Sequence, residues 1–324
     1  MMGLSKKIRS AALAALPVLA MIAIACSSGS DEQVASALAQ QQPGSDTPSG
    51  FRVDELPLIR GPISEDGLQA IFATPDLGIG EHRVGFVLQS KTGLVRTPAV
   101  SVSFYFVDDS GNRELKKTAL ATFKVWPYAT RGIYITQMDF DTAGRWELEI
   151  NVLEQGGDGG TAQLAFDVDQ DTSAPAAGTV AINSASKTLS DVEDISQLTT
   201  GSLQDPDLYR LSISDALNSG LPTVIVMASP AFCTTAVCGP QVEVLQELKD
   251  AYKGQANFIH VDFYDNPDEI QGDLDRAILS PTVLEWSLPS TEWSFVIDRD
   301  GTVAGRFESF TTYEELEQSL QDVL

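Results

Sequence analysis

Two cysteines in the C-terminal third of the chain, Cys233 and Cys238, have the side chains best suited to chemistry. Within one regular helix, five positions correspond to a rise of about 7.5 Å and a rotation of about 500°, so the two thiols would face apart. A disulfide needs Cα atoms within roughly 7 Å and Cβ atoms that face each other. Pairing therefore requires Cys233 to lie outside the helix, or the first turn of the helix to be unwound. Pro240 fits a helix that begins only near Cys238 or Gly239, because proline is tolerated in a first turn. The spacing predicts a loop over 230–237 and a feasible disulfide.

The third cysteine, Cys26, follows a segment that is typical of export signals. Lys6, Lys7 and Arg9 are followed by a 15-residue apolar run over 11–25, interrupted by one proline. A membrane-spanning helix needs about 20 apolar residues, so the run fits a signal peptide better. The Ala-Ile-Ala before Cys26 resembles the lipobox of bacterial lipoproteins, in which the cysteine is acylated and the chain is cut just before it. An ordinary signal peptide, or an uncleaved anchor, with Cys26 as a bystander is the alternative.

The lipoprotein resemblance implies a location and a cysteine pairing. Residues 1–25 would be removed as a signal peptide, and lipid on Cys26 would hold the protein on the cell membrane, facing outside the cytoplasm. Three cysteines are an odd number, which needs an explanation in an exported protein. With Cys26 acylated, Cys233 and Cys238 remain as one pair, and a disulfide can persist outside the cytoplasm.

The charge of the chain excludes one class of partner. The sequence holds 21 basic and 45 acidic residues, a net charge of −24. Loss of the signal peptide removes three basic residues, which leaves 18 against 45 and a net charge of −27. Such a surface repels phosphate backbones, so we expect no nucleic-acid binding. The length of 324 residues and the 43% of hydrophobic residues allow two packed domains.

Composition and periodicity divide the mature chain into four parts. Residues 26–50 are rich in Ser, Gln, Gly, Asp and Pro and predict a flexible tether. Over 51–170, apolar and polar residues alternate in about seven short strands that are separated by turn residues. One apolar face per strand predicts two sheets packed face to face, an all-β immunoglobulin-like sandwich. Residues 171–205 predict a linker and residues 206–324 an α/β domain.

Three short motifs of the β-rich part resemble a family of small extracytoplasmic sandwiches, the FixH/YtkA-like and copper-resistance-type domains. The motifs are Gly-Glu-His-Arg-Val at 80–84, Arg-Gly-Ile-Tyr at 131–134 and Ala-Gly-Arg-Trp-Glu-Leu at 143–148. Some members bind copper through His and Met. Here only His82 and Met138 are available, without visible clustering, so we expect packing or surface roles for both and no metal.

From residue 206 the pattern is that of an α/β domain. An apolar run over 223–228 predicts a strand covered on both faces, and it leads into the cysteine loop. Apolar residues then recur at intervals of three and four as far as Tyr252, which predicts an amphipathic helix. The other expected elements are a second apolar strand, a β-hairpin and a final helix, over 258–263, 293–307 and 313–323.

This order resembles that of thioredoxin-like domains, and the segments 261–267 and 295–301 resemble the membrane-anchored thioredoxins of cytochrome maturation. The resemblance implies that Cys233 sits at a helix N-terminus, which lowers its thiol pKa, and attacks, while Cys238 resolves. The implied substrate groove includes Phe232, where many members have Trp. The cis-proline of the family falls on Glu292 or Trp293, and Pro289 would replace it only through a longer loop.

The four-residue gap between the cysteines also resembles the loop of Q-type peroxiredoxins. Those enzymes place an arginine before the hairpin strand, where this chain has Thr291 and Glu292, and a carboxylate there would raise the thiol pKa. His260 is the only histidine near the cysteines. A lone histidine on an apolar strand is usually packed and hydrogen-bonded, so we expect no copper site and no cofactor.

The leading hypothesis from the sequence is a membrane-tethered thiol–disulfide oxidoreductase that acts outside the cytoplasm. Cys233 and Cys238 would exchange electrons with exported thiol proteins or a membrane electron donor, and the sandwich would be a spacer or docking module. The first alternative is a non-catalytic binding or structural lipoprotein in which the disulfide is a staple. The closed loop is short, so the stabilisation expected from such a staple is modest. The second alternative is a thiol peroxidase.

Overall fold

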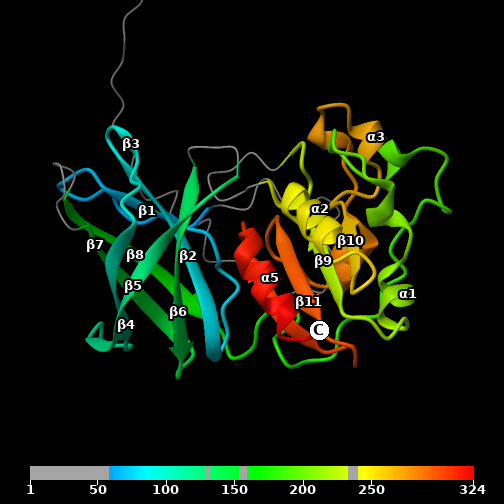
Figure 1. Ribbon diagram of the computed structural model, residues 1–324. Helices are drawn as coiled ribbons and strands as arrows, with labels where there is room; N and C mark the ends of the chain where they lie inside the picture. Colours follow the sequence, from blue (N-terminus) through cyan, green and yellow to red (C-terminus); the bar gives the residue numbers. More distant parts are fainter. Residues whose placement is uncertain (1–57, 128–130, 153–158, 233–239) are drawn as a thin grey trace, which may run out of the picture. The chain divides into compact units, whose positions relative to one another are not determined.

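Eight antiparallel strands in the first half of the described chain form one continuous sheet (Figure 1). The strands are β1 (Gln69–Phe72), β2 (Gly80–Ser90), β3 (Gly93–Leu94), β4 (Ala99–Val107), β5 (Arg113–Val125), β6 (Gly132–Phe140), β7 (Gly144–Val152) and β8 (Gly160–Val168). Their order is β1-β2-β6-β5-β4-β7-β8, and β3 pairs with β2. Because β1 also contacts β8, the sheet curls into a nearly closed, barrel-like shape. The computed structural model describes residues 58–127, 131–152, 159–232 and 240–324.

The expected immunoglobulin-like sandwich is therefore wrong. In a sandwich the pairing would be interrupted between two sheets, whereas here β5, a strand of 13 residues, pairs with β4 along most of its length and with β6 at its end. A register shift between Phe104 and Tyr105 lies in the β4–β5 ladder. An alternating pattern predicts one buried face per strand, but it does not distinguish two flat sheets from one sheet that curls.

Aromatic side chains fill the inside of the curled sheet. The Trp146 ring meets the Phe140 ring edge-on at 4.9 Å between centroids, and its indole N–H donates to the Thr142 carbonyl at 3.0 Å. Where the sheet nearly closes, Gly61 passes close to β8. A Cβ atom there would lie 1.8 Å from the Gln163 carbonyl oxygen, so only glycine fits.

The second half of the described chain is built on a four-stranded mixed sheet with the order β10-β9-β11-β12. Its strands are β9 (Thr223–Met227), β10 (Asn257–Val261), β11 (Trp293–Ile297) and β12 (Val303–Glu308). β9 is parallel to β10 and antiparallel to β11. The helices are α1 (Ile213–Leu217), α2 (Gln241–Ala251), α3 (Pro267–Ile270), α4 (Pro281–Glu285) and α5 (Tyr313–Gln321).

This part does not form a clear thioredoxin fold, so the expected thioredoxin-like domain is also wrong. Only α2 and α5 exceed five residues among the described helices. Between β10 and β11 the chain forms only the short helices α3 and α4 and a 3-10 turn. Pro267 and Pro281 begin those helices, and the left-handed residues Gln271 (φ 49°) and Ser287 (φ 51°) follow them. Left-handed residues end helices, so each helix stops after about one turn.

The outer face of the eight-stranded sheet packs against the second sheet within one compact unit, residues 52–324. Val87 and Ile133 of the first sheet belong to the same apolar cluster as Phe310 and Leu316. The Trp126 ring meets the Phe310 ring at 5.8 Å. The contact explains why apolar residues on both faces of β2 and β6 are buried. In the described part of the chain, no helix is both long and apolar enough to cross a bilayer.

Replacement of Trp146 by alanine should lower the free energy of unfolding by about 3–5 kcal/mol, because it removes a fully buried ring from the aromatic cluster. Urea unfolding followed by circular dichroism measures this loss. Leu115→Ala is the control, because Leu115 is 55% exposed and its removal should change the free energy by no more than about 0.5 kcal/mol. Equal losses in the two variants would contradict the proposed core.

Candidate functional site

The cysteines lie outside the described residues, but the segments on either side of the pair are described. Cys26 is in residues 1–57, and Cys233 and Cys238 are in residues 233–239. Before the pair, β9 runs into Ala228–Phe232, where the Phe232 amide donates to the Ser229 carbonyl at 3.0 Å. After it, α2 begins at Gln241 with Pro240 as its N-cap residue. The predicted disulfide, its loop and the lipidation of Cys26 thus stay predictions.

The four residues expected to line a substrate groove differ in exposure. Phe232 is half-buried, and its ring meets the Tyr264 ring edge-on at 5.8 Å. Pro289 is also half-buried, and no described peptide bond is cis. Glu292 and Trp293 are buried. The Trp293 indole stacks on Phe295 at 5.7 Å, as expected for a core residue.

His260 is held in the core by hydrogen bonds to both ring nitrogens. Nδ1 lies 2.7 Å from the Tyr209 hydroxyl and Nε2 lies 3.0 Å from the Ala228 carbonyl oxygen. Burial lowers the pKa of His260 to about 4, so the ring is neutral near pH 7. A neutral imidazole has one N–H, which Nε2 must donate to the carbonyl, so Nδ1 accepts the Tyr209 hydroxyl proton. Neither nitrogen is free to bind a metal. The described residues contain no group of three or more potential His, Cys, Asp or Glu ligands.

His82 and Met138 are brought together in the first sheet. They are directly paired residues of β2 and β6. Met138 is buried in the aromatic core, and the His82 ring lies 6.1 Å from the Phe140 ring. Met138 is a core residue, whereas His82 is half-buried and its Nε2 accepts the Gly78 N–H at 3.3 Å.

The sequence pattern does not single out the carboxyl group of Asp262, which the structure shows to be buried and hydrogen-bonded. It follows β10 and is 3% exposed. Oδ2 accepts the Thr200 backbone N–H at 2.7 Å and the Thr200 hydroxyl at 2.8 Å, and Oδ1 accepts the Tyr264 N–H at 3.1 Å. Burial raises the pKa of Asp262 to about 6, although these hydrogen bonds act in the opposite direction.

Thr200 connects this acid to the segment that leads to Cys233. The Thr200 hydroxyl lies 3.0 Å from the Ser229 hydroxyl and accepts the Ala231 N–H at 3.3 Å. Ala231 is two positions before Cys233. The protonation state of Asp262 is therefore coupled, through one threonine, to the backbone at the base of the cysteine segment.

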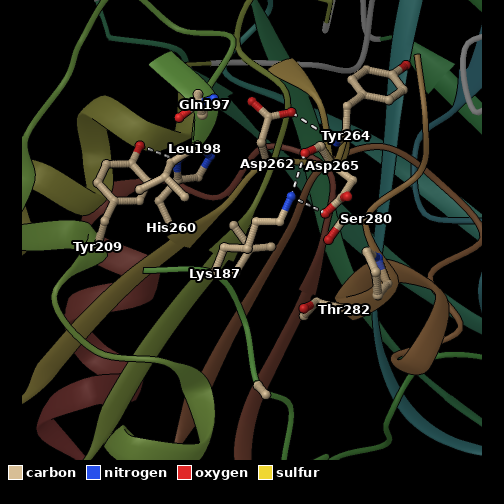
Figure 2. Close-up of a pocket in the computed structure, with 13 residues that line it drawn as sticks. Lys187, Gln197, Leu198, Tyr209, His260, Asp262, Tyr264, Asp265, Ser280 and Thr282 are labelled. Carbon is tan, nitrogen blue, oxygen red and sulfur yellow. Dashed lines mark hydrogen bonds and ion pairs between the residues drawn. The ribbon is translucent and has the colours of Figure 1, made fainter. Parts of the chain in front are cut away.

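Asp262 also lines a polar pocket of about 160 Å³ (Figure 2). Lys187 points toward Asp265 in this pocket, with its ammonium group 2.7 Å from the carboxylate and 2.8 Å from the carbonyl oxygen. Ser280 and Thr282 add hydroxyl groups to the wall. Among the described residues no ion pair reaches Asp262, so its charge is held by N–H and O–H donors alone. Such a carboxyl group can take up and release a proton near neutral pH.

A weak sequence signal for Asp262 existed, but none for Thr200. Asp262 stands at the end of an apolar strand, and in a parallel pair the carboxyl ends of both strands lie at the same edge. An acid there faces the loop after β9. Thr200 lies in the segment expected to be a linker, where nothing distinguishes it from the neighbouring Ser, Thr and Asp residues.

Comparison with protein families and with curated proteins found no match to this chain.

Replacement of Asp262 by asparagine should remove one pH-dependent contribution to stability. The folded protein holds this proton up to a pKa of about 6, whereas the ordinary value is 3.8. The wild-type free energy of unfolding should therefore fall as the pH rises from about 4 to 6 and stay level above that, by up to about 3 kcal/mol for this group.

Urea unfolding from pH 4 to pH 7.5 measures the difference between wild type and D262N. That difference should change across the same window, in favour of the variant. Asp265→Asn is the matched control, because Asp265 is 31% exposed and already paired with Lys187. Parallel curves for wild type and D262N would contradict a raised pKa.

Proposed function

We propose that this protein is a thiol–disulfide oxidoreductase whose working pair is Cys233 and Cys238. The observation that carries the proposal is the hydrogen-bonded connection from Asp262 through Thr200 to Ser229 and Ala231. Burial of an acid costs folding free energy, and acids with raised pKa values are concentrated at functional sites. Asp262, with a pKa of about 6, is hydrogen-bonded through Thr200 to the segment that leads to the first cysteine.

The proposed exchange transfers two electrons from the cysteine pair to a disulfide of the substrate. The Cys233 thiolate attacks a disulfide of the substrate, forms a mixed disulfide and releases one substrate thiolate, which takes a proton. The Cys238 thiolate then attacks the Cys233 sulfur, forms the internal disulfide and releases the second substrate thiolate. The two electrons gained by the substrate come from the cysteine pair, which an exported thiol protein or a membrane electron donor reduces again.

Asp262 is a positioning residue in this proposal. Its carboxylate accepts two hydrogen bonds from Thr200, which in turn contacts the Ser229 hydroxyl and the Ala231 N–H. Protonation of Asp262 weakens the carboxylate as an acceptor and removes a negative charge near the base of the cysteine segment. Since a nearby negative charge raises a thiol pKa, neutral Asp262 favours the thiolate.

The burial of Glu292 and Trp293 favours the second candidate, a non-catalytic protein in which the disulfide is a staple. Two of the four residues expected to bind substrate do not face solvent. In that case serine at both cysteine positions would lower stability and leave the binding function unchanged.

The reduction potential of the Cys233–Cys238 pair separates the two candidates. An exchange protein should have a reduction potential between roughly −270 and −120 mV, and a structural disulfide one below about −300 mV. Equilibration with glutathione or dithiothreitol buffers, followed by thiol trapping, measures it in the full chain. C233S and C238S are the controls, because each removes the exchange.

The pH profile of trapping tests the role of Asp262. Wild-type Cys233 should show an inflection near pH 6 besides its own titration, and D262N should lose that inflection and react faster at pH 7. The same profile in both proteins would remove Asp262 from the proposal.

Replacement of Cys26 by serine tests the membrane tether that we propose with this function. If Cys26 is acylated and holds the protein on the outer side of the membrane, C26S should move from the membrane fraction to the soluble exported fraction and lose label from a radioactive fatty acid. C233S is the matched control and should stay with the membrane. Labelling of C26S equal to that of wild type would contradict the lipid anchor.

A further inference from the structure

A second group of buried charges lies where β12 and α5 contact the outer face of the eight-stranded sheet. Glu308, at the end of β12, is 3% exposed. Its Oε2 accepts the Asp76 backbone N–H at 2.9 Å, and its Oε1 accepts the Ser290 hydroxyl. Asp76 lies between β1 and β2, and Ser290 lies just before β11. One carboxyl group thus connects three segments that are far apart in the sequence.

Ionic contacts surround this carboxyl group. Arg306, on β12, pairs with the Asp76 carboxylate, which also accepts the backbone N–H groups of Ser173 and Ala174. Arg83, on β2, donates to the Glu308 backbone oxygen at 3.0 Å.

Arg83 is itself neutralised by α5. Its Nε lies 2.8 Å from Glu315 Oε1. Burial opposes the ionisation of Glu315, but the Arg83 guanidinium outweighs burial and lowers the Glu315 pKa. Arg83 and Glu315 therefore form a balanced pair and contribute no net charge to the junction.

A cavity of about 70 Å³ next to Glu308 is lined by further charged or titratable groups, Glu81 and His82 of β2 together with Asp76, Arg83 and Arg306. Burial, followed by the nearby Arg306 charge, lowers the pKa of His82 to about 4, so His82 is neutral near pH 7. The Arg306 Nε atom is buried with no hydrogen-bond partner among the described residues. Arg306 is paired with Asp76, and its charge also acts on Glu308 without a direct ion pair among the described residues.

We propose that Glu308 makes this junction pH-sensitive: the contact between the eight-stranded sheet and β12–α5 is closed while Glu308 carries a proton and opens locally when the proton leaves to solvent. An ionised Glu308 would leave one negative charge without a cation of its own in a site from which water is largely excluded. Opening lets water solvate that charge. The group is poised for this role, because burial raises the pKa of Glu308 to about 7.

The size of the effect follows from linkage. A carboxyl group with a pKa of about 7 in the closed form and its ordinary value of 4.5 in the open form raises the opening equilibrium about tenfold between pH 6 and pH 8. The Asp76 amide is a direct reporter, because its hydrogen bond is to Glu308 itself.

Hydrogen–deuterium exchange of the full chain at pH 6 and pH 8, corrected for intrinsic exchange rates, measures the opening of segments 73–79 and 304–310. The wild type should open about tenfold more at pH 8. Glu308→Gln, which stays neutral, should give the same low opening at both pH values. Unchanged wild-type opening, or a pH response of normal size in E308Q, would overturn the proposal.

Glu315→Gln is the matched control, because Glu315 is a carboxylate of the same junction with a lowered pKa. It should increase opening at both pH values. Because it also frees the Arg83 charge beside Glu308, it should reduce the tenfold ratio, whereas E308Q should abolish the ratio without raising the opening. Should E308Q fail to fold, Ser290→Ala replaces it. The Ser290 hydroxyl stabilises the charged form of Glu308, so its loss should move the pH at which the junction opens to a higher value. A move to a lower pH would contradict the proposal.

Discussion

A shortage of cations is the constraint on which the buried polar sites of this protein depend. The chain holds 21 basic against 45 acidic residues, and the carboxyl groups that the fold buries are not all paired with a lysine or arginine. Asp76 and Glu315 have an arginine partner, whereas Asp262 is held by a threonine and backbone N–H groups. Glu308 feels the charge of Arg306, but the ion pair of Arg306 is with Asp76. Hydrogen bonds alone do not offset the loss of water around a charge, so both groups hold their protons to a higher pH than an ordinary carboxyl group does.

The local structure could be predicted from the sequence to a useful extent. The apolar run at 223–228 corresponds to β9, the three–four periodicity before Tyr252 to α2, and the final amphipathic segment to α5. These patterns are read over neighbouring residues, and burial of one face is enough to enforce them.

The arrangement of these elements could not be predicted, because it depends on pairing between distant strands. The sandwich expectation failed on β5, whose length joins β4 and β6 in one sheet. The thioredoxin expectation failed between β10 and β11, where prolines and left-handed residues limit the helices to single turns. Within the candidate site, Asp262 lay inside the strand predicted over 258–263, whereas in the structure it directly follows β10. The role proposed for Asp262 depends on its hydrogen bonds with Thr200, which is 62 positions away, and no local sequence pattern reveals that contact.

The close passage of Gly61 over β8 has a consequence for the protein in concentrated solution. β1 and β8 are the two ends of the strand order, and unpaired strand edges are the places where sheets of separate molecules join. Because the Gly61 segment pairs with β1 through the Ala70 carbonyl and lies against β8, it covers the gap between the two ends. Any side chain at position 61 would push this segment away from β8 and expose the edges of β1 and β8. Folded molecules would then self-associate through these exposed strands.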